Sequence, residues 1–303
     1  MTLPKSVALF ALALLTIGAK ASPPDTERIV DASTGHMVTT AINGRPMKLR
    51  VDLDTSDWIM LNAASAARAG LDGSMLKFTT RLYGVKVKID SSLTRVKVGA
   101  LNKGRRVFWF DRDVIDAPAD GIVGPSHLPE NRVTLRFHPP VPGERTIELA
   151  VDHSMIRGPR YRLDIGEETI WVNLAPLRPL SVATAAAGAY LAQQRDGHWT
   201  GPPQTVKVPP GIDRPGRPMA LRKPLDINGL ADESFLVRTA DYRGGFALPP
   251  DEEESADPDE IVITGKTSRG RAQLWLTLGK DVLGGCSSIT HDKRRQMLIL
   301  RCL

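Results

Sequence analysis

The chain has 303 residues, of which 42% are hydrophobic and 24% are charged, a composition typical of globular proteins. The formal net charge is +6, but the basic residues are scattered and form no basic helix, which argues against nucleic-acid binding. After the first 21 residues, no apolar run approaches the length of a membrane span.

The first 21 residues have the pattern of a secretory signal peptide. Lys5 supplies a positive charge, residues 7–17 are apolar, and Ala19 and Ala21 form a small-x-small cleavage site. An N-terminal membrane anchor is the alternative, but the apolar run is short for one. We therefore predict cleavage after Ala21 and a periplasmic or secreted mature protein.

Residues 37–53 are expected to form a hairpin that leads into a turn bearing a carboxylate. Asn43-Gly44 lies between two apolar runs, which is a strong hairpin signal. The stretch 51–61 then has the pattern of a strand, a tight turn and a second apolar strand. An alanine-rich helix is expected at 63–70.

The remainder of the first half is expected to be rich in strands. The expected strands are 78–89, interrupted by Tyr83-Gly84, then 93–98, 106–110, 120–124, 133–137 and 146–151. We expect the last two to pair as a hairpin.

The stretch around the carboxylate turn occurs twice. When the chain is shifted by 121 residues, Val172–Val182 lies under Val51–Leu61 without a gap, and the apolar positions coincide. A second alanine-rich helix follows in register. The sequence Ile-Val-Gly at 122–124 also has a counterpart, Thr-Leu-Gly at 277–279. This internal repeat predicts two similar units.

We therefore divide the mature chain into two predicted lobes, 30–155 and 156–303. Within the second, residues 198–218 are rich in proline and glycine and show no periodicity, so we expect an irregular segment. Short strands are expected at 225–229 and 234–239. An acidic loop is expected at 249–260.

The chain has two cysteines, Cys286 and Cys302. They flank two runs that meet at a charged turn, 292–295, so a hairpin would place the cysteines opposite each other. Two buried thiols are the alternative. Because the predicted export leads to an oxidising compartment, we predict a disulfide, worth about 3 kcal/mol of stability.

The triplet Asp54-Thr55-Ser56, with its apolar flanks and its repeat, resembles the Asp-Thr-Gly motif of pepsin-like and retropepsin-like aspartic peptidases. The resemblance implies an all-β fold with short helices, built from two acid-protease-like lobes related by a pseudo-twofold axis. It makes Asp54 the candidate catalytic residue and places Thr55 and Ser56 beside the substrate. Tyr83 and Gly84 match a flap over the cleft, although an exposed tyrosine before a turn glycine would look the same.

The second copy of the motif departs from the family pattern. The ungapped repeat puts Ala175 where the second catalytic aspartate belongs and Pro176 where a hydroxyl residue belongs. Aspartic peptidases need two close carboxylates that share one proton, one acting as base and the other as acid. Candidate replacement acids are Asp52, Asp57, Asp164 and Asp226, and a homodimer could pair two copies of Asp54.

Three functions remain open from the sequence: a peptide-binding pseudo-peptidase, an active aspartic endopeptidase using Asp54 with an unrecognised partner, and a structural envelope protein that reuses the fold. We expect a monomer that holds a peptide or protein segment between its lobes. No cofactor and no metal are expected, because the histidines lack metal-ligand spacing. These histidines are His36, His127, His138, His153, His198 and His291.

Overall fold

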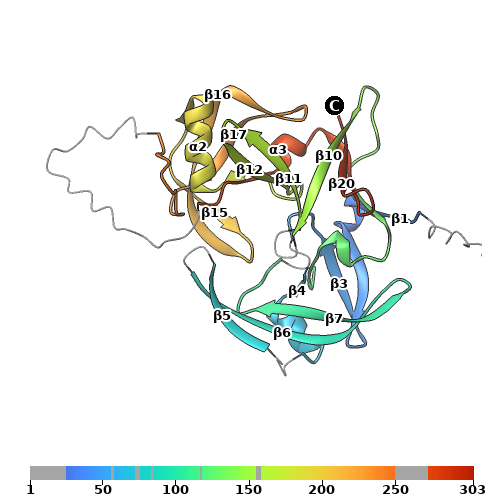
Figure 1. Ribbon diagram of the computed structural model, residues 1–303. Coiled ribbons are helices and arrows are strands. Elements are labelled where there is room, and N and C mark those ends of the chain that lie inside the picture. The colour runs from blue at the N-terminus through green and yellow to red at the C-terminus, as the bar shows by residue number, and fades with distance from the viewer. Residues whose placement is uncertain are drawn as a thin grey trace, which may run out of the picture.

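The computed structural model describes residues 25–55, 58–71, 76–82, 85–116, 118–154, 158–249 and 272–303. Strands dominate these residues, so the predicted all-β class is confirmed (Figure 1). The helices within the described ranges are short: α1 (Ala63–Arg68), α2 (Ala185–Arg195), α3 (Lys280–Leu283) and the 3₁₀ turns Ala32–Thr34 and Pro125–His127.

The N-terminal half of the chain forms a seven-stranded sheet in the order β2-β3-β8-β4-β7-β6-β5. A further pairing of β2 with β6 curls this sheet toward a barrel. Its strands are β2 (Met37–Ile42), β3 (Arg45–Val51), β4 (Ile59–Leu61), β5 (Leu76–Leu82), β6 (Val85–Val98), β7 (Leu101–Phe110) and β8 (Gly121–Val123). The Asn43-Gly44 hairpin is confirmed, since both residues have the positive φ that such turns require.

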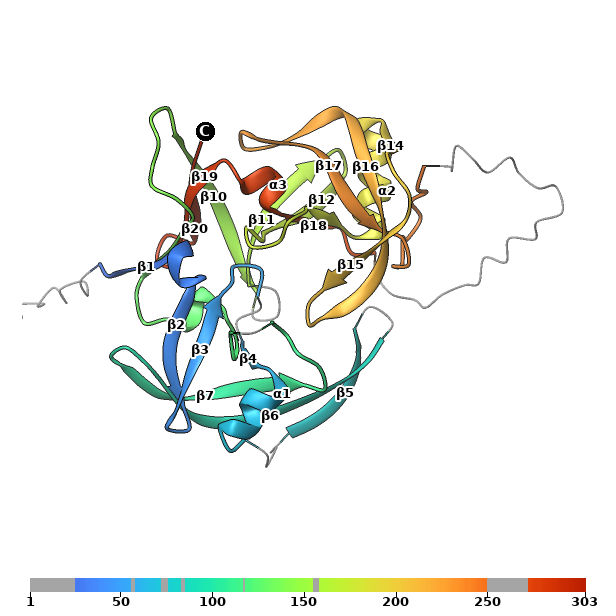
Figure 2. The same cartoon turned by 180° about the vertical axis from the view of Figure 1, so that it is seen from behind.

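The C-terminal half, together with β1, β9 and β10 from earlier in the chain, builds a thirteen-stranded sheet (Figure 2). Its order is β1-β9-β19-β20-β10-β11-β12-β18-β13-β17-β16-β14, with β15 paired to β16. Its strands are β1 (Glu27–Asp31), β9 (Arg132–Arg136), β10 (Arg145–Ser154), β11 (Gly158–Ile165), β12 (Glu168–Leu174), β13 (Val182–Ala183), β14 (Gly197–Trp199), β15 (Gln204–Val208), β16 (Ile212–Ile227), β17 (Leu230–Arg238), β18 (Trp275–Leu278), β19 (Cys286–Asp292) and β20 (Met297–Cys302).

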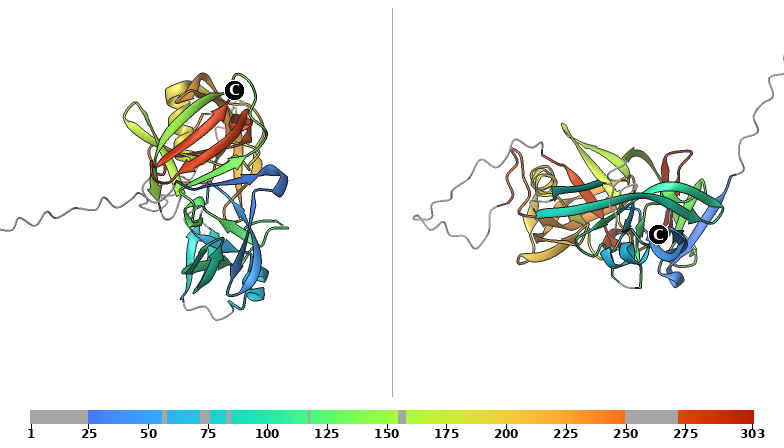
Figure 3. Two further views of the ribbon diagram at one scale, coloured as in Figure 1. Left: turned by 90° about the vertical axis from the view of Figure 1, so that its right-hand side faces the viewer. Right: turned by 90° about the horizontal axis from the view of Figure 1, so that it is seen from below.

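Two sequence-based expectations about strands are wrong. β9 and β10 do not form a hairpin with each other, because β9 pairs with β1 and β19 while β10 pairs with β11 and β20 (Figure 3). The C-terminal hairpin, β19 and β20, lies between them. Local sequence patterns could not predict this pairing, because the strands are far apart in the sequence. The segment 198–218 is not irregular: most of it lies in β14, β15 and the start of β16.

The C-terminal hairpin is held by the predicted disulfide. β19 and β20 pair antiparallel, with Cys286 directly opposite Cys302, and the two sulfur atoms are bonded. Within this hairpin Ile289, Leu298 and Leu300 are almost fully buried. The bond therefore closes the open end of a hairpin whose inner face belongs to the core.

The predicted internal repeat corresponds to two units with the same pairing. In the first, β8 lies between β3, parallel, and β4, antiparallel, and α1 follows. In the second, β18 lies between β12, parallel, and β13, antiparallel, and α2 follows. This repeated arrangement is consistent with the predicted acid-protease-like fold. The exact lobe boundaries stay a prediction.

The register of the two units corrects the ungapped alignment. Ile122 pairs with Arg50 and Met60, whereas its counterpart Thr277 pairs with Asn173 and Val182. The shift is therefore 123 residues at the first strand and 122 at the second, because the loop between them is one residue shorter in the second unit.

The two halves meet in an apolar cluster and at two glycines. The cluster joins Met60, Val87, Ile89, Phe108, Phe110 and Ile122 of the N-terminal half to Val182, Val206, Val208, Ile212 and Leu236 of the C-terminal half. A Cβ on Gly158 would lie 2.5 Å from the backbone oxygen of Thr55, and one on Gly211 would lie 2.7 Å from that of Asp113. Both glycines have positive φ. Glycine thus allows the backbones of the two halves to touch.

Several sequence-based predictions fall outside the described residues: the signal peptide, Ser56, Asp57, Tyr83, Gly84 and the acidic loop beyond Pro249. No helix among the residues that are described has both the length and the apolar character needed to cross a membrane.

Packing at the centre of the first unit predicts that alanine substitutions at two strand glycines change the stability of the protein by very different amounts. A Cβ on Gly121 would lie 2.1 Å from the backbone oxygen of Met60, whereas one on Gly104 meets nothing within 4 Å. Gly121→Ala should lower the free energy of unfolding by about 2–3 kcal/mol, because backbone must move to admit the methyl group. Gly104→Ala is the control and should change it by less than about 0.5 kcal/mol. Urea unfolding curves of both variants measure this, and equal stabilities would contradict the tight packing of β8.

Candidate functional site

A cavity of about 440 Å³ lies between the two halves, and the loop after β3 reaches its rim with Asp54 and Thr55. Volumes of this size are common for sites that bind small molecules or side chains of a larger ligand. The N-terminal half contributes Asp54, Thr55, Trp58, Met60, Thr80, Leu82, Ile89 and Phe110. The C-terminal half contributes Asn173, Arg178, Val182, Thr184, Val208, Pro209, Pro210, Arg238, Gln273, Trp275 and Thr277.

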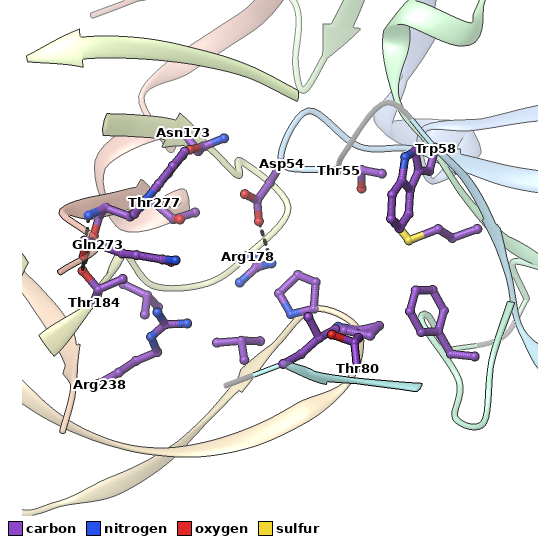
Figure 4. Close-up of a pocket in the computed structure, with 18 of the residues that line it drawn as sticks. Asp54, Thr55, Trp58, Thr80, Asn173, Arg178, Thr184, Arg238, Gln273 and Thr277 are labelled. Atoms are coloured by element: carbon purple, nitrogen blue, oxygen red, sulfur yellow. Dashed lines mark hydrogen bonds and ion pairs between the residues drawn. The ribbon is translucent and has the colours of Figure 1, made fainter. Parts of the chain in front are cut away.

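The carboxylate of Asp54 is presented by a turn that its neighbour Asp52 stabilises. Asp52 accepts a hydrogen bond from the backbone N–H of Asp54 at 3.2 Å and another from the Arg50 guanidinium at 3.1 Å. Leu53 and Thr55, on either side of Asp54, are buried. An aspartate that binds the N–H two residues ahead fixes the turn, so the Asp54 side chain is directed into the cavity (Figure 4).

The group that faces Asp54 is a guanidinium. Arg178 Nη2 lies 2.6 Å from Asp54 Oδ2, and the exposed fractions of the two side chains are 22% and 12% (Figure 4). Charge-assisted contacts of this length are among the stronger interactions of side chains. Among the described residues that line the cavity, Asp54 is the only acid.

Arg178 is held in place by a short loop fastened to α3. The backbone N–H of Arg178 donates to Ala175 O at 2.9 Å, and Lys280 N–H donates to Arg178 O at 2.7 Å. The Asp281 carboxylate accepts from Ser181 through its N–H at 2.7 Å and its hydroxyl at 2.8 Å. The loop is thus anchored at its start, middle and end, and the guanidinium is pre-positioned toward Asp54.

Ala175 does not oppose Asp54 as the ungapped repeat suggested. Its side chain is 1% exposed, and its backbone N–H donates to Leu278 O at 2.8 Å. The equivalent bond in the first unit runs from Asp52 N–H to Val123 O at 3.1 Å. Ala175 therefore corresponds to Asp52, and the position that faces Asp54 belongs to Arg178, three residues further along the chain.

The replacement acids considered from the sequence do not line the cavity in the described part of the chain. Asp52 is bound to Arg50 and to the turn. Asp164, an exposed residue of β11, binds Arg162 and Thr169, and Asp226 accepts from Gly229 N–H in a hairpin turn. Asp57 is not among the described residues.

Of the four residues predicted to contact substrate, Thr55 lines the cavity. Ser56, Tyr83 and Gly84 lie outside the described residues, so their roles stay predictions. The strands on either side of the predicted flap pair antiparallel, with Leu82 opposite Val85.

Sequence reasoning missed Arg178, Arg238 and the wall formed by 208–210. Arg178 carried one usable signal, since it is a charged residue in the loop that lacks the second aspartate. Residues 208–210 were not recognised as part of the cavity, because their prolines are typical of an irregular segment. No local pattern identifies Arg238, which is brought to the cavity by the pairing of β17 with β13 and β16.

Asp232 on β17 is a buried titratable group that does not line the cavity. Burial raises the pKa of its carboxyl to about 7, the hydrogen bond from Ser234 N–H opposes the rise, and the charges of Asp281 and Glu233 add to it. Among the described residues, no cluster of three or more His, Cys, Asp or Glu residues could hold a metal ion.

No family model and no curated protein matches the chain. Among solved structures, the retroviral protease-like domain of Ddi1 from Leishmania major is 19% identical, with a TM-score of 0.23, over 29% of this chain and 70% of that chain. EIAV protease in complex with the inhibitor HBY-793 is 22% identical, with a TM-score of 0.22, over 30% of this chain and 81% of that chain. These scores are too low to support a statement about function.

The contact between Asp54 and Arg178 predicts a measurable coupling between the two halves. In a double-mutant cycle with Asp54→Asn and Arg178→Gln, we expect a coupling of about 1–3 kcal/mol in the free energy of unfolding, because the pair is partly buried. The exposed pair Arg295 and Glu148 is the control and should couple more weakly. Additive effects of the two site substitutions would contradict the pair.

Asp232 predicts a pH dependence of stability. Its folded pKa of about 7 exceeds its usual value of 3.8, so the folded state binds more protons between these values. The free energy of unfolding should therefore fall as pH rises from about 4 to about 7, by on the order of 3 kcal/mol from this group alone. Asp232→Asn keeps an acceptor for Ser234 N–H and should remove this fall.

The control for this experiment is Asp164, whose pKa is lowered by its contacts with Thr169 and Arg162. Asp164 contributes stability that is lost as pH falls. Asp164→Asn should therefore change the slope of the free energy of unfolding against pH in the direction opposite to Asp232→Asn. Urea unfolding at a series of pH values measures both slopes. A wild-type and Asp232→Asn pair with identical pH profiles would contradict the assignment.

Proposed function

We propose that this chain is an exported pseudo-peptidase that binds an extended peptide between its two halves with little or no hydrolysis. The observation that carries the proposal is the 2.6 Å contact between Asp54 and Arg178. A guanidinium occupies the place beside Asp54 that the chemistry of an aspartic peptidase reserves for a second carboxyl group.

The chemical reason is proton transfer. Amide hydrolysis by a carboxyl pair requires one group to take a proton from water while the other donates one to the carbonyl oxygen. An arginine side chain stays protonated in proteins, so it cannot exchange that proton. Asp54 can still orient a water molecule, but no other described residue that lines the cavity carries a carboxyl group that could act as the acid. Loss of one acid–base group typically costs about 10²–10⁴-fold in rate.

Peptide binding is supported by the strand at the edge of the cavity. β5 is the last strand of its sheet, and its residues Thr80 and Leu82 line the cavity. A sheet edge beside a cavity can accept an extended peptide as an added strand, with backbone hydrogen bonds giving affinity and pockets giving selectivity. The apolar residues of the cavity would then receive alternate side chains of the peptide.

Export is supported by two independent features. The first 21 residues match a signal peptide, and the Cys286–Cys302 disulfide is typical of proteins from oxidising compartments. We propose a periplasmic or secreted monomer, since one chain already contains two units with the same strand pairing.

We expect no cleavage of denatured casein at acidic pH that depends on Asp54. Wild type, Asp54→Ala and Arg178→Gln are compared, each with and without a statine-type inhibitor. Equal, negligible cleavage by all three supports the proposal. Inhibitor-sensitive cleavage by wild type that disappears in Asp54→Ala would instead make the protein an active endopeptidase.

The same preparations are tested for binding by calorimetric titration with a pool of end-blocked decapeptides. Binding by wild type that a bulky substitution in the cavity, Thr184→Trp, abolishes supports a peptide cleft. An exposed substitution on β16, Lys223→Trp, is the control. Absence of binding in wild type would favour a structural protein that reuses the fold.

A further inference from the structure

Three half-buried side chains extend from the cavity across the sheet of the C-terminal half. Trp171 of β12 and Trp275 of β18 are paired in register, and their ring centroids lie 6.3 Å apart. The guanidinium carbon of Arg160, on β11, lies 3.9 Å from the ring centroid of Trp171 and 5.5 Å from that of Trp275. The three strands are neighbours in the sheet (Figure 2). We call these three residues the Arg160 platform.

The platform is a continuation of the cavity. Side chains two residues apart on a strand share a face of the sheet. Asn173, two residues after Trp171, and Thr277, two residues after Trp275, both line the cavity, and Trp275 lines it as well. A ligand that leaves the cavity along this face therefore meets the platform next.

Neither indole is packed into the core. Among the described residues, the buried apolar clusters and the side chains packed against them include neither Trp171 nor Trp275. Tryptophan is enriched where proteins bind other chains, because it combines a large apolar surface with a polar edge. Two neighbouring tryptophans beside a cavity thus favour a binding surface.

The charge of Arg160 is not neutralised within the described part of the chain. Its cross-strand neighbour on β10 is Asp152, but no described carboxylate forms an ion pair with Arg160, whose guanidinium lies over Trp171 instead. Its Nε also has no hydrogen-bond partner there. Arg162, two residues further along β11, differs because its Nε donates to Asp164 at 3.0 Å.

Stacking prepares Arg160 to bind an anion. The ring fixes the plane of the guanidinium through its face, whereas the N–H groups that bind a carboxylate point outward in that plane. Little side-chain freedom is then lost when a ligand binds. A carboxylate matches the planar donor group and supplies the negative charge that the platform lacks.

We propose that the Arg160 platform receives an Asp or Glu side chain of the peptide, adjacent to the residues held in the cavity. The inference rests on the proposed function and adds a requirement for an acidic residue beside an apolar core. A side chain is the source of the carboxylate because the platform lies beyond the cavity, where an extended peptide continues. A free C-terminus supplies the same chemistry and is an outcome of the test.

Four N-acetylated peptides with the core Leu-Phe-Val and serine spacers test the proposal. Glu stands two residues before the core in the first and two residues after it in the second, with Gln at the opposite place. The third has Gln at both places, and these three are C-terminal amides. The fourth is the third with a free C-terminus.

Calorimetric titration of wild type should show one Glu peptide binding about tenfold more tightly than the third peptide, since hydrogen bonds to charged groups contribute about that much. The preference should shrink when NaCl is raised from about 0.05 M to about 0.5 M, because Arg160 is partly exposed.

Three variants assign the effect to Arg160. Arg160→Gln should bind the Glu and Gln peptides equally, and Arg160→Glu should prefer the Gln peptide. The control is Arg162→Gln, which lowers the net charge by the same amount on the same strand and should keep the wild-type preference. Circular dichroism and an unchanged affinity for the third peptide check that each variant is folded.

The outcomes separate this inference from the proposed function. Equal binding of Glu and Gln peptides by wild type overturns the acidic requirement and leaves the peptide cleft standing, whereas binding of no peptide overturns both. A preference shown by the fourth peptide alone makes a C-terminus the ligand and overturns the side-chain proposal. A preference that survives in the Arg160 variants, or that Arg162→Gln also removes, overturns the assignment to Arg160.

Discussion

The ion pair between Asp54 and Arg178 is the contact on which the character of the site depends. It joins a loop of the N-terminal half to a loop of the C-terminal half at 2.6 Å, in a place where neither side chain is more than 22% exposed. Removing two charges from water is costly, and the cost is offset only if they meet with good geometry. The two loops must therefore be held in position before the pair can form.

The surrounding structure supplies that position from both sides. Asp52 fixes the turn that carries Asp54, and Asp281 with α3 fixes the loop that carries Arg178. Gly158 lets the backbone of one half approach Thr55 of the other, and the shared apolar cluster holds the two sheets together. Rigid loops on a packed scaffold are a usual way to position functional groups.

The same geometry is the basis of the proposed function, binding with little or no hydrolysis. A fold that brings two loops together can place two carboxyl groups in contact, but here it places a carboxylate against a guanidinium, which keeps its proton. What remains is a cavity lined by both apolar and polar side chains, among them Arg178 and Arg238. The proposed peptide binding rests on this cavity and on β5, the last strand of its sheet, which could pair with an extended peptide.

The sequence by itself determined the features that rest on local signals: the Asn43-Gly44 hairpin, the strand–turn–strand–helix repeat, the turn bearing Asp54 and the cysteine-closed hairpin. Each depends on turn chemistry or on periodic apolar residues a few positions apart. Tertiary structure decided the pairing of β9 with β19, the register of the second unit and the partner of Asp54. These depend on contacts between residues far apart in sequence, so neither the one-residue difference in loop length nor the contact of Arg178 with Asp54 could be read from local patterns.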